Sequence, residues 1–136
     1  MSVYKPLIEV ANRNSVSVVA GAAIPLVTAV HGNSNVLTSN GTGVSINRVA
    51  GYYQATAKVS FTVPAAGTVT LSIVKDGTVI AKSIVTAATA TTYNVVIPVI
   101  FLSKCCTLPN VISVTTDLAI TSVDSTLDVV YLSERG

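Results

Sequence analysis

The chain has 136 residues, of which 10% are charged and half are apolar, and its formal net charge is +2. This length corresponds to one domain, and the low charge without a Lys/Arg cluster excludes the electrostatic surface that nucleic-acid binding requires. Because soluble domains usually carry about 25% charged residues, we expect much of the surface to contact other protein. Val, Ile and Thr fill more than a third of the positions, which predicts an all-β fold.

The N-terminal third is the least regular part of the chain. Residues 1–14 show little periodicity and are predicted to form an extended arm, followed by one β domain over residues 15–136. The apolar stretch 16–30 could serve as the core of a signal peptide, but Pro25 interrupts it and favours two short buried strands around Gly21. Without a signal, the protein is expected to be made in a reducing cytoplasm. Residues 31–43, rich in Gly, Asn and Ser, predict a loop.

The middle of the chain carries the clearest strand signals. Apolar and polar residues alternate strictly over 52–63, which predicts a strand with one buried face. Asp76–Gly77 between two β runs predicts a hairpin with a type I′ turn, because both residues tolerate positive φ. Residues 93–102 are apolar on both faces, so we expect both faces to be covered, and Pro98 indicates an edge or a bulge. Further strands are expected at 68–74, 79–85, 111–116, 118–123 and 125–132, with a turn at 64–67 and a loop at 86–92.

These eight to ten short strands, with turns about every ten residues and no helical period, predict a sandwich, a jelly roll or a closed barrel. The order of strands does not distinguish among the three.

No set of residues predicts catalysis, a cofactor or a metal site. His31 is the only histidine, and two adjacent cysteines with one histidine fall short of the four ligands of a structural zinc site. Asp124 and Asp128 lie four apart in a strand and face the same side, where we expect a solvated sheet edge. We therefore expect no enzymatic activity.

Cys105 and Cys106 are the only cysteines. Adjacent Cα atoms lie about 3.8 Å apart across a trans peptide, whereas a disulfide prefers roughly 4.4–6.8 Å. Neighbouring side chains of a strand also point to opposite faces. Both residues are therefore expected to be reduced structural thiols that pack as small apolar side chains.

Two groups of segments resemble a known superfamily. Residues 43–81, with Gly51, Tyr53 and the Lys75–Asp76–Gly77 turn, resemble the central strands of the C1q/TNF-like jelly-roll superfamily. The later pattern, with Cys105–Cys106 before Val111–Val114 and a closing Leu127–Arg135, is similar to small structural proteins of phages and prophages of gut bacteria. The resemblance covers residues 43–135 and implies a single-domain antiparallel jelly-roll sandwich that assembles as a homotrimer.

The resemblance leads to one hypothesis of function with an alternative. The leading hypothesis is a bacteriophage virion structural protein, a trimeric capsid decoration (auxiliary) or head-fibre protein on the capsid surface. It would bind the major capsid protein or another virion protein and stabilise the shell, without nucleic-acid or membrane partners. The alternative is a receptor- or glycan-binding tip module of a phage fibre, using loops 31–43 and 86–92. The arm residues expected to contact the capsid are Tyr4, Pro6, Leu7 and Ile8. The large side chains expected in the trimer interface or the core are Tyr53, Phe61, Tyr93, Phe101 and Tyr131.

Overall fold

The computed structural model describes residues 6–32, 36–47, 49–103 and 109–133. Within these residues the regular structure is entirely β, as the composition predicts. The strands are β1 (Leu7–Asn12), β2 (Val16–Val18), β3 (Thr28–Gly32), β4 (Leu37–Ser39), β5 (Gly43–Ile46), β6 (Gly51–Thr62), β7 (Gly67–Lys75), β8 (Thr78–Ala87), β9 (Tyr93–Ser103), β10 (Asn110–Thr116) and β11 (Ile120–Ser133).

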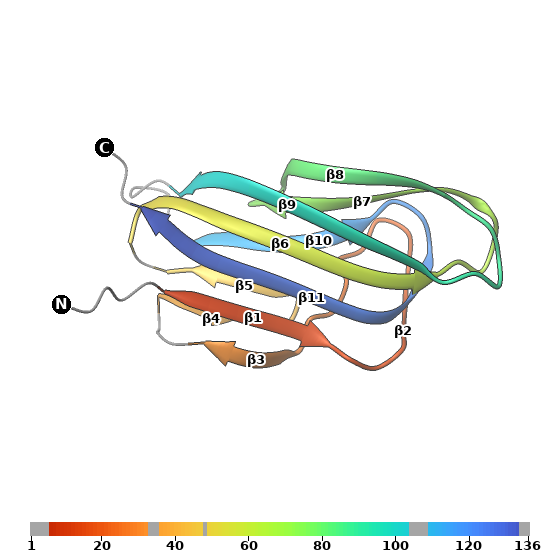
Figure 1. Ribbon diagram of the computed structural model, residues 1–136, viewed down its shortest axis with the longest axis horizontal. Coiled ribbons are helices and arrows are strands. Elements are labelled where there is room, and N and C mark those ends of the chain that lie inside the picture. Colours follow the sequence, from red (N-terminus) through yellow and green to blue (C-terminus); the bar gives the residue numbers. More distant parts are fainter. Residues whose placement is uncertain (1–5, 33–35, 48, 104–108, 134–136) are drawn as a thin grey trace.

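The strands form two antiparallel sheets that pack face to face (Figure 1). Sheet A has the order β3-β1-β11-β6-β9, with β2 paired to one end of β11, and sheet B has the order β4-β5-β10-β7-β8. Strands that are distant in sequence are neighbours in both sheets, as in β11, which lies between β1 and β6. The fold is an antiparallel jelly-roll sandwich, which selects one of the three architectures that the strand pattern allowed.

The core lies between the inner faces of the two sheets. On β6 the buried side chains alternate with outward polar ones, which confirms the period of two predicted for this segment. Sheet B contributes Leu71, Ile73 and Ile112, which are 0% exposed. Such alternation is expected of a sandwich in which each sheet has one dry and one wet face.

Local turn chemistry fixes the β7–β8 hairpin. Asp76 and Gly77 have φ values of 51° and 87°, the positive values that a type I′ turn requires, so the predicted hairpin is confirmed. The Asp76 carboxylate accepts hydrogen bonds from Asn110 Nδ2 and from the Val111 backbone N–H, both at 2.7 Å. The turn is thereby tied to β10, so a local signal also positions a distant strand.

The prediction of an arm over residues 1–14 is wrong for its second half. Residues 7–12 form β1, which pairs with β11 on one side and with β3 on the other. Val10 is 0% exposed and Ile8 is 5% exposed, so this segment belongs to the core. Its strand character depends on pairing with β3 and with β11, which is more than 110 residues away in sequence, and local periodicity does not show such pairing.

Two other boundaries differ from the prediction. The loop expected at 31–43 contains the short strand β4 and the end of β3. The two strands expected at 118–123 and 125–132 are one strand, β11, with a register shift between Ser122 and Asp124. A bulge of this kind accommodates an extra residue without ending the strand.

The prediction for the acids of β11 is wrong, and the prediction for the proline of β9 is confirmed. The solvated edge expected around Asp124 and Asp128 is wrong, because β11 is an inner strand whose outward face is wet. Pro98 lies in β9, the edge strand of sheet A, as its missing N–H predicted.

Candidate functional site

The five predicted aromatic residues lie in the interior of the sandwich, where they form two clusters. Tyr53 stacks on Phe101 with ring centroids 6.0 Å apart and contacts the edge of Tyr131 at 5.3 Å. Phe61 and Tyr93 form the second pair, with centroids 5.7 Å apart. Tyr53, Phe61 and Phe101 are buried in the core, and Tyr93 and Tyr131 are half-buried against it; a role in a trimer interface stays a prediction.

Tyr53 is the most deeply buried of these aromatic polar groups. Its hydroxyl donates a 2.6 Å hydrogen bond to the Val49 carbonyl oxygen. Burial, and secondarily the neighbouring Tyr131, raise the pKa of Tyr53 from 10.0 to about 12. The hydroxyl therefore stays protonated at neutral pH and acts as a structural donor.

The outer face of sheet A exposes apolar side chains where a water-facing sheet usually carries polar ones. On β9, Val96 and Ile100 are 58% and 62% exposed, and Pro98 between them is also exposed. Tyr52 of β6, which is 40% exposed, adds an aromatic ring on the same face. We name these four residues the apolar strip. Residues 96, 98 and 100 share one face because successive side chains of a strand alternate.

The sequence signal for this strip was the apolar run at 93–102, which predicted that both faces of the strand are covered. In the single chain, sheet B covers only the inner face, where Val95 and Ile97 are buried. The outward positions remain open to solvent. The prediction that both faces are covered is therefore wrong for the single chain.

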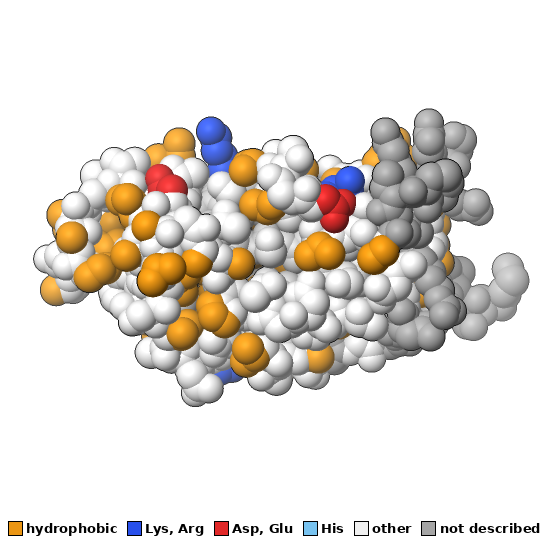
Figure 2. Space-filling view, turned by 180° about the vertical axis from the view of Figure 1, so that it is seen from behind, with side chains coloured by type: hydrophobic (Ala, Val, Ile, Leu, Met, Phe, Trp, Pro, Cys, Tyr) orange, Lys and Arg blue, Asp and Glu red, His pale blue; other side chains and the backbone are white. Residues whose placement is uncertain are grey.

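The rest of the surface is poor in charge. Figure 2 shows the opposite side of the molecule, over sheet B, with a few charged side chains among scattered apolar ones. The exposed apolar residues on β8 include Val79 and Ile84. Both sheets therefore present surface that is suited to contact with protein.

Among the described residues, the candidate chemical side chains do not come together into a reactive centre. Cys105, Cys106 and Tyr4 lie outside the described residues. The described part of the chain holds no cluster of three or more His, Cys, Asp or Glu side chains that could bind a metal ion. Asp76 is engaged by its turn, and Asp124 forms a salt bridge with Arg13 at 3.0 Å. No helix among the described residues is long and apolar enough to span a membrane.

The predicted capsid contacts are divided by burial. Pro6 and Ile8 are buried in the fold, so neither is available to a partner surface. Leu7 is half-buried on the outer face of sheet A. The prediction that Pro6 and Ile8 contact the capsid is therefore wrong.

Comparison with known proteins identifies solved structures with a similar fold. The chain matches no protein-family model and no curated protein. Solved structures match along nearly its whole length. Murine APRIL at pH 5.0, of the TNF family, aligns with a TM-score of 0.76 and 15% identity over 95% of this chain and 100% of that one. The globular domain of zebrafish complement 1qA aligns with a TM-score of 0.71 and 8% identity over 96% and 99%.

The chain has a C1q/TNF-like jelly-roll fold. The expectation drawn from Gly51, Tyr53 and the Lys75–Asp76–Gly77 turn is thus confirmed at the level of the fold. The PRD1 vertex protein P5 also aligns, with a TM-score of 0.67 and 15% identity over 94% of this chain and 97% of that one.

Proposed function

We propose that this protein is a structural component of a bacteriophage virion, which assembles as a homotrimer through the outer face of sheet A and binds the capsid shell. The observation that carries the proposal is the apolar strip on a C1q/TNF-like sandwich that is otherwise complete. A few residues at the centre of a contact, tyrosine among the most frequent, supply most of the binding energy of protein interfaces, and burial of aliphatic side chains adds to it.

Three further observations support this proposal. Only 10% of the residues are charged, which suits a chain whose surface is largely covered by other protein. The similarity to the PRD1 vertex protein P5 links the same fold to a virion, although at 15% identity it carries the fold alone. Such a role does not require an enzyme site, since binding to a shell and stabilising it depend on surface complementarity.

The first experiment is the mass of the isolated protein in solution by light scattering coupled to size exclusion, with and without reductant. We expect roughly 42 kDa, three times the 13.9 kDa of one chain, in both conditions. A stable mass of one chain at high protein concentration would refute assembly through the apolar strip.

The second experiment addresses the virion. Virions purified on a density gradient from lysates that express the chain should carry it in a fixed ratio to the major capsid protein, as measured by quantitative mass spectrometry. We propose that the residues before β1 contribute to this attachment. Deletion of residues 2–5 should then release the protein from particles but leave its mass in solution unchanged. Recovery of the full-length chain only in fractions without particles would contradict the virion assignment.

A further inference from the structure

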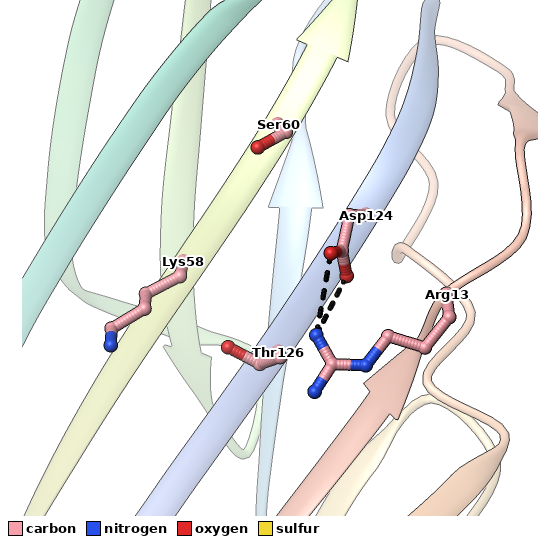
Figure 3. A pocket seen from close by; sticks show the side chains of 5 residues that line it. All are labelled: Arg13, Lys58, Ser60, Asp124 and Thr126. Carbon is pink, nitrogen blue, oxygen red and sulfur yellow. Dashed lines mark hydrogen bonds and ion pairs between the residues drawn. The ribbon is translucent and has the colours of Figure 1, made fainter.

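A small pocket with two cationic side chains opens on the outer face of sheet A, next to the apolar strip, since Lys58 of β6 is directly opposite Val96 of β9. It has a volume of about 180 Å³ and is lined by Arg13, Lys58, Ser60, Asp124 and Thr126. Figure 3 shows the Thr126 side chain between Lys58 on one side and Arg13 on the other. None of these residues was singled out from the sequence as a group, because strand register alone brings them together.

The register explains the grouping. Thr126 of β11 is directly opposite Lys58 of β6, and Asp124 is opposite Ser60 after the register shift in β11. Without that shift, the residue before Asp124 would take its place opposite Ser60, and the carboxylate would turn to the other face. Arg13 follows the last residue of β1 and reaches across to Asp124.

The pocket has an excess of positive charge. Arg13 Nη1 donates to both Asp124 carboxylate oxygens, at 3.0 and 3.3 Å, which neutralises one cation. Within the part of the chain that the structure describes, Lys58 forms no ion pair. The guanidinium also keeps further N–H donors beyond Nη1, since arginine carries five. The pocket therefore offers one unpaired ammonium and spare guanidinium donors.

The Thr126 hydroxyl has no hydrogen-bond partner among the described residues. Thr126 is only 7% exposed and its Oγ1 atom is buried beneath the neighbouring side chains. Buried polar groups are nearly always satisfied, so an unpaired hydroxyl in a pocket indicates a missing acceptor. The Ser60 hydroxyl donates to Asn94 Oδ1 and forms no hydrogen bond with Thr126 Oγ1 in the structure. The long Arg13 and Lys58 side chains are exposed and can rotate to admit a ligand.

We propose that this pocket binds one oxyanion group, a carboxylate or a phosphate, which accepts hydrogen bonds from Thr126 Oγ1, Lys58 Nζ and a free N–H of Arg13. The volume equals that of about six waters at ~30 Å³ each and lies below the roughly 300–1,000 Å³ of sites that enclose a whole organic ligand. The pocket thus fits a single charged group. This inference does not depend on the proposed role in a virion.

The test uses the intact protein and two probes, inorganic phosphate and acetate, with sodium chloride at matched ionic strength as the reference. Amide shifts in ¹H–¹⁵N NMR spectra should saturate with at least one probe and centre on residues near Thr126 and Lys58. Thr126→Val removes only the hydroxyl and should weaken binding about tenfold. Lys58→Met should weaken it at least as much. Lys82→Met, which removes an exposed lysine from β8 on the other sheet, is the matched control and should bind normally.

The same titration distinguishes the source of the anion. If the carboxylate of a neighbouring copy occupies the pocket, saturating phosphate should lower the mass of the assembly. An unchanged mass would identify a free anion as the occupant. The proposal would be overturned if the amide shifts do not saturate or if chloride reproduces them. It would also be overturned if both pocket variants fold and neither of them alters the shifts.

Discussion

Replacing Ile100 by glutamate tests the proposed interface at its most exposed apolar residue. Ile100 is 62% exposed in the single chain. Complete burial of an isoleucine side chain contributes about 1.5–3 kcal/mol, so covering the exposed fraction contributes about 1–2 kcal/mol per copy. A trimer contains three copies, which gives about 3–6 kcal/mol per assembly. At 1.4 kcal/mol per tenfold change, Ile100→Glu should lower the association constant by about 10²–10⁴, and burial of the new carboxylate should lower it further.

The assay is sedimentation velocity over a range of protein concentrations, with circular dichroism to verify the fold. The matched control is Ile84→Glu, because Ile84 is 60% exposed on β8 of sheet B. We expect Ile100→Glu to shift the protein toward 13.9 kDa and Ile84→Glu to leave the assembly intact. If Ile84→Glu dissociates the assembly and Ile100→Glu does not, the interface is on the other sheet and our reasoning is wrong.

Three predictions concern stability. Deleting residues 2–12 removes β1 from between β11 and β3, so we expect aggregated or unfolded protein by circular dichroism, whereas a native spectrum would mean that β1 is dispensable. Because the pKa of Tyr53 is about 12 in the fold and 10.0 otherwise, the unfolded chain loses this proton first. Stability in urea should hold up to about pH 10 and then fall by up to about 1.4 kcal/mol per pH unit toward pH 12, a slope that Tyr53→Phe should reduce. Asp76→Ala removes the acceptor of two 2.7 Å hydrogen bonds and should lower the free energy of unfolding by about 1–3 kcal/mol in the same urea assay. Asp76→Asn should lower it less, because asparagine tolerates positive φ. Equal losses of stability in the two variants would contradict this explanation.

The features that the sequence predicted well are those set by neighbouring residues. The alternation over 52–63 and the Asp76–Gly77 turn depend on strand geometry and on φ, which act over a few residues. The apolar run at 93–102 predicted a strand with two covered faces; the strand is confirmed, but its outward face is exposed. These signals predicted an all-β fold and left the choice among sandwich, jelly roll and barrel open.

The features that were missed depend on pairing across the chain. Residues 7–12 are a strand only because β11 and β3 bind their backbone groups on both sides. The polar segment around Asp124 continues as a strand because a bulge absorbs one residue, although its composition resembles a turn. The oxyanion pocket requires the register between β6 and β11, so no spacing along the sequence could have indicated it.

The position of β11 has a consequence for how the protein is made. This strand is the last one in the chain and is 14 residues long; it lies between β1 and β6 and pairs with the backbone of both. During synthesis, β1 and β6 therefore each have one unpaired edge until residues 120–133 have emerged from the ribosome. Pairings between such distant segments form slowly, and open strand edges favour aggregation. A cell that produces many copies of this chain would benefit from a supply of chaperones, and truncation within the last strand should be far more harmful to yield than its position near the end of the chain suggests.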